Sequence, residues 1–347
     1  MFSPGILSSW PMALGIFLVS LMFVIATSAR FTRRLEELCE ALNLSIGILS
    51  LLSALGANIP NYVSSVIAIL GGHEDVGIGI IVGSNIYNIA IILGLCTWLT
   101  PERAGMKLDV QEKRDVRVIA WYAFVITLLS FVVIIFWLPG ESLVTTLHAS
   151  RFPTVLLPLT RVLVLGIFGA LLVHILRRSH GSAGSSLHHH EHPGRKAPLS
   201  LVRLGSEIIF TLAIALGGVL VMVQSGQTLT ADLHLPSVLA GLVVLAVATS
   251  LPNTVVAVSL VRTGEAAACV EEVCSSGSIN IALGIVLPLL FWQGVLGDRF
   301  LLILDMPLAL ALVAGVLFFV LRGRLSRGFG SLLLATYVAW VVLRFWV

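Results

Sequence analysis

The sequence predicts an all-α, polytopic membrane protein with ten transmembrane helices arranged as two inverted five-helix repeats. Of its 347 residues, 57% are hydrophobic and only 11% are charged, whereas a soluble domain has about 25% charged residues. Long apolar runs also recur along the whole chain, and a polar motif returns in the second half. This composition excludes a soluble enzyme, a disordered chain and a nucleic-acid binder, so no nucleic-acid partner is expected.

Ten apolar runs are long enough to cross a hydrocarbon core as helices of about 20 residues. They are predicted at 11–29, 44–70, 76–99, 117–138, 154–176, 204–224, 236–261, 267–292, 300–321 and 329–346. The second and seventh runs contain Pro60 and Pro252. Proline removes a backbone donor, so both positions are predicted to break or kink their helices.

The basic residues predict how these spans are oriented. With the N-terminus outside, 17 of the 21 Lys and Arg residues fall on the inner side of the membrane. The other four are Arg151, Arg161, Arg299 and Arg344. Because short cytoplasmic loops are enriched in Lys and Arg, both termini are predicted outside and the central loop cytoplasmic. The expected location is a bacterial-type inner or plasma membrane, with the lipid bilayer as a partner.

The longest connection divides the chain into a first five-helix repeat at 1–176, a linker at 177–203 and a second five-helix repeat at 204–347. The linker contains the tract His188, His189, His190, Glu191 and His192. Such a tract can bind transition metals. A flexible cytoplasmic linker between two halves is the favoured interpretation.

An internal repeat supports this division, because sliding the chain by 192 residues aligns a motif at 45–94 with one at 237–286. The aligned identities include Ser45 on Ser237, Pro60 on Pro252, Asn61 on Asn253, Ser84 on Ser276 and Asn88 on Asn280. Since five spans is an odd number, the second copy enters the membrane from the opposite side. Inverted repeats with a matched pair of interrupted helices are typical of secondary transporters working by alternating access.

The repeated motif predicts a binding site at the membrane midplane. Each proline frees a carbonyl about one turn earlier, and such oxygens can coordinate a hard cation. The spacing of four between Ser84 and Asn88 places both on one helical face. The predicted site comprises Asn61, Asn253, Asn88, Asn280, Ser84, Ser276, Thr249, Ser250, Asn58 and Ala57. Interhelical hydrogen bonding is the competing interpretation, and the repetition favours a substrate site.

These motifs resemble the α-repeats of the cation/Ca²⁺ exchanger superfamily, the sodium/calcium exchangers in particular. The chain reads Gly56-Ala57-Asn58-Ile59-Pro60-Asn61 and Gly83-Ser84-Asn85-Ile86-Tyr87-Asn88 in the first repeat, and Ala248-Thr249-Ser250-Leu251-Pro252-Asn253 and Ser276-Gly277-Ser278-Ile279-Asn280 in the second. The resemblance implies a helical bundle with a midplane ion site. It also implies antiport through movement of the first and sixth spans.

The sequence departs from this family at the positions that carry charge. The family places Glu after each proline, where this chain has Asn61 and Asn253, and often Asp at the position of Asn280. Carboxylates set the affinity of Ca²⁺ sites, so a neutral centre predicts poor Ca²⁺ exchange. Glu272, one turn before Ser276, is a candidate accessory acid; the competing interpretation places it near the inner membrane surface.

The predicted function is a secondary-active transporter with a neutral site for a monovalent cation or small polar solute. The alternative is a non-transporting membrane binding or regulatory protein that retains the exchanger fold. An enzyme is not expected, because the chain contains neither HExxH nor GxSxG. No cofactor is expected beyond Na⁺ or another cation bound at the asparagine cluster.

Overall fold

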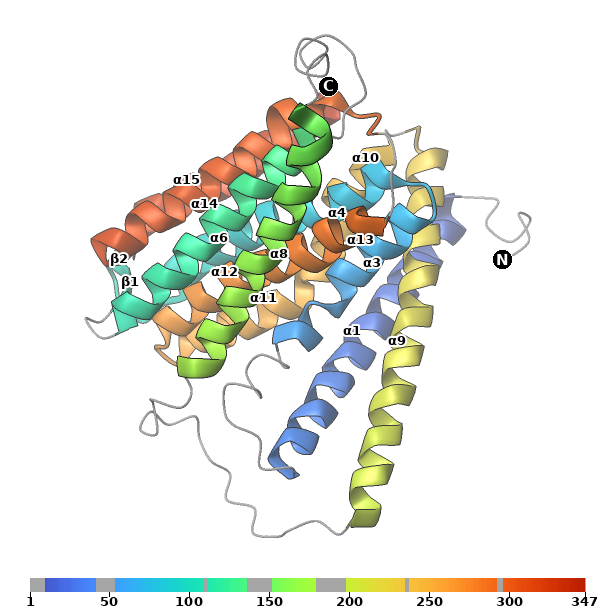
Figure 1. The fold of residues 1–347 in the computed structure, drawn as a ribbon, viewed down its shortest axis with the longest axis horizontal. Coiled ribbons are helices and arrows are strands. Elements are labelled where there is room, and N and C mark those ends of the chain that lie inside the picture. Colours follow the sequence, from blue (N-terminus) through green and yellow to red (C-terminus); the bar gives the residue numbers. More distant parts are fainter. Residues whose placement is uncertain are drawn as a thin grey trace.

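The computed structural model describes residues 10–41, 54–108, 112–135, 152–178, 198–234, 237–291 and 296–346. Helices α1 and α9 lie side by side along one edge of the molecule, and the other long helices form a bundle beside them (Figure 1). The His188–His192 tract and Ser45 lie outside the described residues.

The helices of the first half are α1 (Trp10–Ala41), α3 (Ile59–Leu70), α4 (Glu74–Tyr87), η1 (Asn88–Leu93), α5 (Gly94–Leu99), α6 (Glu112–Ile135) and α8 (Phe152–Arg178). Those of the second half are α9 (Pro198–Asp232), α10 (Ser237–Leu239), η2 (Ala240–Leu245), α11 (Ala246–Arg262), α12 (Ala266–Ile281), η3 (Ala282–Val286), α13 (Leu287–Phe291), η4 (Leu301–Asp305), α14 (Met306–Arg322) and α15 (Arg327–Trp346). The η elements are π-helical turns, which are over-represented at functional sites.

Within the described ranges, eight helices are long and apolar enough to span a membrane, and two shorter apolar helices lie at 59–70 and 159–174. The prediction of an all-α, polytopic membrane protein is therefore confirmed, whereas the count of ten spans stays a prediction. The helices α1 and α9 extend beyond the first and sixth predicted spans, because they contain 32 and 35 residues. Both helices continue into polar sequence, where hydropathy no longer marks their ends.

Two short strands supplement the helices. β1 (Gly105–Lys107) pairs antiparallel with β2 (Arg324–Ser326), and Met106 lies opposite Leu325. Both side chains are fully buried. This pairing joins the connection after α5 to the connection between α14 and α15, so it ties the two halves of the chain together.

The turns that end α3 and α11 have the same backbone conformation in both repeats. Gly72 and Gly264 end equivalent helices with φ values of 79° and 91°, a left-handed conformation that glycine adopts at little cost. The residue after each glycine donates its N–H to the carbonyl of Ala68 or Leu260, at 2.9 Å in both copies. This helix-ending turn is the same in both repeats, as the 192-residue offset requires.

Two helices form the centre of the bundle. The continuous segments Glu74–Leu99 and Ala266–Phe291 are 94% and 78% buried, whereas the other six candidate spans are at most half buried. They carry the repeated Ser–Asn pairs, one pair in each half. Polar groups buried this far from water need hydrogen-bond partners inside the protein. The Ser and Asn side chains of these two helices are therefore expected to bond one another or a bound ligand.

Glycines let the two halves approach backbone to backbone at this centre. A Cβ atom on Gly83 of α4 would lie 2.0 Å from the carbonyl oxygen of Leu242 in η2, and one on Gly241 would lie 2.2 Å from that of Val76. Small residues permit such close helix contacts in membranes. The contact brings the polar residues of α4 against the start of α11.

Candidate functional site

Polar side chains of α3, α4, α11 and α12 meet between the two halves of the chain. The four repeated asparagines, Asn61, Asn88, Asn253 and Asn280, are each at most 1% exposed. The other predicted polar residues are buried with them: Asn58, Ser84, Thr249, Ser250 and Ser276. Hydrogen bonds join Asn58, Asn61, Asn88, Asn253 and Ser276 directly, and the other predicted polar residues are buried on the same elements.

The first repeat interrupts its helix at the site. Residues 54–57 are helical, Asn58 lies in a turn, and α3 begins at Ile59 with Pro60 in its first turn. The N–H of Asn61 donates to the carbonyl of Asn58 at 3.0 Å, rather than to Ala57, its partner in a regular helix. Together with the missing donor of Pro60, this arrangement leaves the carbonyls of Gly56 and Ala57 without their usual donors.

The second repeat differs, because α11 continues through Pro252 without a break. No break occurs at Pro252, and a kink at this position stays a prediction. Two neighbouring hydroxyl groups bond backbone carbonyls near the proline: Thr249 Oγ1 donates to Leu245 O at 2.8 Å, and Thr254 Oγ1 donates to Ser250 O at 3.1 Å. Such hydroxyl groups, with the π-helical turn η2 just before, allow a membrane helix to accommodate an internal proline.

Asn58 is the hub of the hydrogen-bond network. Its Nδ2 donates to the backbone carbonyl of Ala54 at 2.8 Å. Because that carbonyl can only accept, the orientation of the Asn58 amide is fixed with Oδ1 toward the centre. This oxygen accepts from Asn253 Nδ2 at 3.0 Å, Ser276 Oγ at 2.5 Å and Asn61 Nδ2 at 3.4 Å.

Ser276 extends the network from the hub. Its single hydroxyl proton is directed to Asn58, so its lone pairs face the remaining neighbours. They accept from Asn253 Nδ2 at 2.8 Å and from Asn88 Nδ2 at 3.2 Å. The nitrogen atoms of three repeated asparagines are therefore held by acceptors of fixed orientation.

The fourth repeated asparagine is oriented through Asn85, a residue that the sequence analysis did not assign to the site. Asn85 Nδ2 donates to the carbonyl of Gly277 at 3.3 Å, and Asn85 Oδ1 accepts from Asn280 Nδ2 at 3.5 Å. Asn85 and Gly277 occupy equivalent positions in the two repeats, separated by 192 residues. The position of Asn85 inside the polar stretch Gly83-Ser84-Asn85 was the sequence signal that could have assigned it to the site.

The network leaves the four repeated asparagines with one property in common. The side-chain oxygens of Asn61, Asn88, Asn253 and Asn280 are all buried without a hydrogen-bond partner, as is Ser250 Oγ. A buried polar atom without a partner costs about 1–3 kcal/mol. Every one of these amides directs its nitrogen to a protein acceptor, so the site presents four neutral acceptor oxygens. Such oxygens suit either a cation or a solute that only donates hydrogen bonds.

The remaining predicted residues contribute fewer hydrogen bonds to the network. Ser84 Oγ donates to Ala246 O across the helix contact at 3.4 Å. Ala57 is half-buried and offers only its backbone. Glu272 is half-buried on α12, and within the described parts of the chain no hydrogen bond or ion pair joins it to the asparagines. The described residues also contain no group of three His, Cys, Asp or Glu side chains placed to hold a metal.

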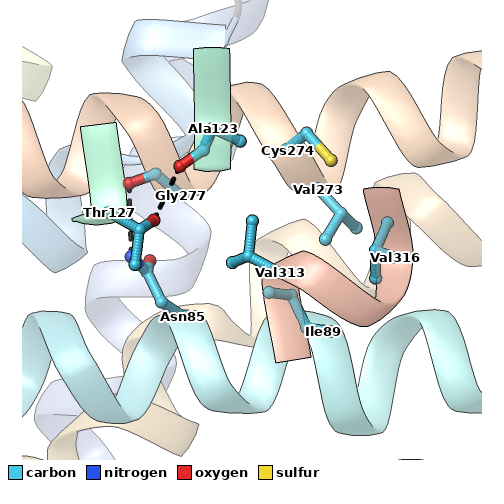
Figure 2. A pocket seen from close by; sticks show the side chains of 9 residues that line it. All are labelled: Asn85, Ile89, Ala123, Thr127, Val273, Cys274, Gly277, Val313 and Val316. Atoms are coloured by element: carbon cyan, nitrogen blue, oxygen red, sulfur yellow. Dashed lines mark hydrogen bonds between the residues drawn. The ribbon is translucent and has the colours of Figure 1, made fainter. Parts of the chain in front are cut away.

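A small cavity of about 20 Å³ lies beside this network. Figure 2 shows Asn85 and Thr127 at one side of it and the apolar side chains of Ile89, Val273 and Val313 at the other. None of the four repeated asparagines lines this cavity. Its volume accommodates little more than one water molecule, so we place the candidate site at the asparagines and not in the cavity.

Comparison with known sequences identifies the family. A family model described as sodium/calcium exchanger protein matches residues 12–177 and 207–346. The chain is 24% identical over 347 residues to the inner membrane protein YrbG of Escherichia coli K12, covering 97% of this chain and 98% of the relative. It is 25% identical over 358 residues to the sodium/calcium exchanger MaX1 of Methanosarcina acetivorans, covering 96% and 98%.

Solved structures show the same fold. The H⁺/Ca²⁺ exchanger CAX superposes with a TM-score of 0.70 at 16% identity, over 95% of this chain and 82% of that chain. The sodium-calcium exchanger NCX_Mj superposes with a TM-score of 0.59 at 20% identity, over 96% and 99%. The expected resemblance is thereby confirmed. Because the family match extends over both halves and the fold recurs in solved exchangers, this chain belongs to the sodium/calcium exchanger protein family of membrane transporters.

Proposed function

We propose that this chain is a secondary-active transporter that binds a monovalent cation among Asn61, Asn88, Asn253 and Asn280, and that it transports Ca²⁺ poorly. The observation that carries the proposal is the set of four buried amide oxygens that no protein donor satisfies. Amide carbonyl oxygens are ligands for hard cations, and two of the four come from each repeat.

The neutrality of the site determines which cation it favours. Born desolvation scales with the square of the charge, so a divalent ion loses about four times the hydration energy of a monovalent ion of equal radius. Amide dipoles offset the smaller cost better than the larger one, because Ca²⁺ affinity depends on the number of ligand charges. A small polar solute that only donates hydrogen bonds is the second candidate substrate.

The orientation of the four amides also separates this proposal from simple interhelical packing. Asparagines that only join helices would use both their nitrogen and oxygen atoms in hydrogen bonds. Here the nitrogen atoms of Asn88, Asn253 and Asn280 join separate helices, and the side-chain oxygen atoms are left over. We expect alternating access to expose these four asparagines first to one side of the membrane and then to the other.

The test is flux into proteoliposomes containing the purified protein, measured for Na⁺, K⁺, Li⁺ and Ca²⁺. We expect saturable flux of a monovalent cation, little Ca²⁺ flux, and loss of flux in Asn61→Ala and in Asn253→Ala. Ser259→Ala is the matched control, because Ser259 is exposed on the same helix as Asn253. Absence of flux and binding across these ions and small polar solutes would contradict the proposal. Cation-induced thermal stabilisation without flux would support the non-transporting alternative.

A further inference from the structure

A groove at one end of α1 has no role in the proposed transport site. It is lined by Ala26, Ala29, Arg30, Arg33, Arg34 and Glu37. Each of these residues has another member of the set three or four positions away along the helix, so together they form a single face. In Figure 1 this end of α1 lies next to the start of α9, away from the rest of the bundle.

Three arginines of the groove differ in their pairing. Arg34 forms ion pairs with Glu37 at 2.8 Å and with Glu207 of α9 at 2.9 Å, so its charge is compensated. Arg30 and Arg33 are exposed, and neither forms an ion pair with any residue that the structure describes. Among the side chains that the structure describes, the groove therefore presents two guanidinium groups without an ion pair, beside a third that is held in place.

The depth of these arginines matches a lipid headgroup. The apolar part of α1 ends at Phe31, and the helix continues to Ala41. Arg30 and Arg33 lie within one turn of that boundary, where we expect the phosphate layer of the bilayer. Ala26 and Ala29, on the membrane side of them, are exposed and small, so they leave room for an acyl chain along the helix.

We propose that this groove binds an anionic phospholipid, with its phosphate between Arg30 and Arg33 and its acyl chain beside Ala26 and Ala29. Guanidinium groups pair with phosphate through two parallel hydrogen bonds. Basic pockets beside membrane helices favour anionic headgroups on the cytoplasmic side, the side that the distribution of basic residues predicts for this end of α1.

The experiment is native mass spectrometry and thermal unfolding of the full chain in detergent, with added phosphatidylglycerol, phosphatidylcholine or soluble glycerol 3-phosphate. We expect bound phosphatidylglycerol and a raised melting temperature, with neither effect from the other two. The double variant Arg30→Gln/Arg33→Gln should weaken binding about thirtyfold. This factor corresponds to the loss of two basic residues, each with the binding free energy usual for one basic residue at an anionic surface. Ala29→Leu keeps both charges and fills the groove, so it should also weaken binding.

Arg262→Gln/Arg324→Gln is the control, because both residues are exposed and the loss of charge is equal. It should leave phosphatidylglycerol binding unchanged. An equal loss in this control would show a general attraction to basic surface and overturn the proposal. Equal binding of glycerol 3-phosphate would overturn it as well, because the groove would then be an anion site without a lipid requirement. Failure of cation flux would leave the lipid result unaffected, since the two sites share no residue.

Discussion

Asn253 of the second repeat donates its side-chain amide to Oδ1 of Asn58 in the first repeat at 3.0 Å. The bond joins residues 195 positions apart across the centre of the molecule. It also orients Asn253, because Asn58 Oδ1 can only accept. The free oxygen of Asn253 is thus a consequence of a contact between the two repeats.

Replacing this hub should affect both stability and binding. Asn58→Ala removes the acceptor of Asn61 Nδ2 and Ser276 Oγ and one acceptor of Asn253 Nδ2. We expect a destabilisation of about 2–4 kcal/mol, since each buried group left unpaired costs about 1–3 kcal/mol. Cation-induced stabilisation should disappear as well. Thermal unfolding with and without the transported cation measures both effects, and a variant as stable and as responsive as Ser259→Ala would contradict the assigned role.

Adding charge to the centre should change its selectivity. Asn61→Glu with Asn253→Glu places carboxylates at the positions where the family resemblance implies them. We expect a marked gain in Ca²⁺ affinity, because ligand charge sets the strength of Ca²⁺ sites. Equilibrium Ca²⁺ binding to the purified double variant measures it. Unchanged Ca²⁺ binding in a folded double variant would remove Asn61 and Asn253 from the centre.

The neutral centre also predicts that translocation of the loaded site moves charge. The four amides are uncharged when empty, and they carry one positive charge when they hold a monovalent cation. Rapid addition of the cation to protein on a solid-supported membrane should therefore give a transient current. Asn61→Asp should reduce that current, because the loaded site becomes neutral. We choose Asn61 because its nitrogen makes only a 3.4 Å hydrogen bond, so little structure is lost. A larger current in the variant would be inconsistent with a neutral site.

The close contact of the two halves predicts that replacing one glycine with alanine destabilises the protein much more than replacing another. Gly83→Ala would place a Cβ atom 2.0 Å from Leu242 O, where backbone must move. We expect the loss of several degrees in melting temperature, together with lower flux, because Ser84 is adjacent. Gly166→Ala in α8 is the control, since no atom lies within 4 Å of its added Cβ, and its better helix propensity should be neutral or slightly stabilising. Equal stability of the two variants would argue against the packing shown.

The sequence predicted the features that depend on composition and repetition. Low charge predicted a membrane protein, and the 192-residue offset brought Asn61 and Asn253 into one cluster because equivalent positions meet across the repeat interface. The helix ends of α1 and α9 were not predictable from hydropathy, because Arg33 and its neighbours are helical beyond the apolar run. The unbroken helix at Pro252 was not predictable either, because a proline inside a membrane helix is compatible with a broken, kinked or continuous helix.

The orientation of the side-chain amides of the four repeated asparagines could not be predicted from residue types. It depends on the backbone carbonyls of Ala54 and Gly277, which fix the amides of Asn58 and Asn85. Only a three-dimensional arrangement shows that the nitrogen atoms are used and the oxygen atoms are not. The boundaries of the two five-helix halves and the sidedness of the termini stay predictions from the basic residues.

The most direct test of the account is a high-resolution density map of the protein in Na⁺ and in a buffer with only a bulky organic cation. The account predicts Na⁺-dependent density at coordination distance from the side-chain oxygens of Asn61, Asn88, Asn253 and Asn280. No such density, with these oxygens accepting hydrogen bonds from protein donors in both maps, would contradict a cation site built from four neutral amides.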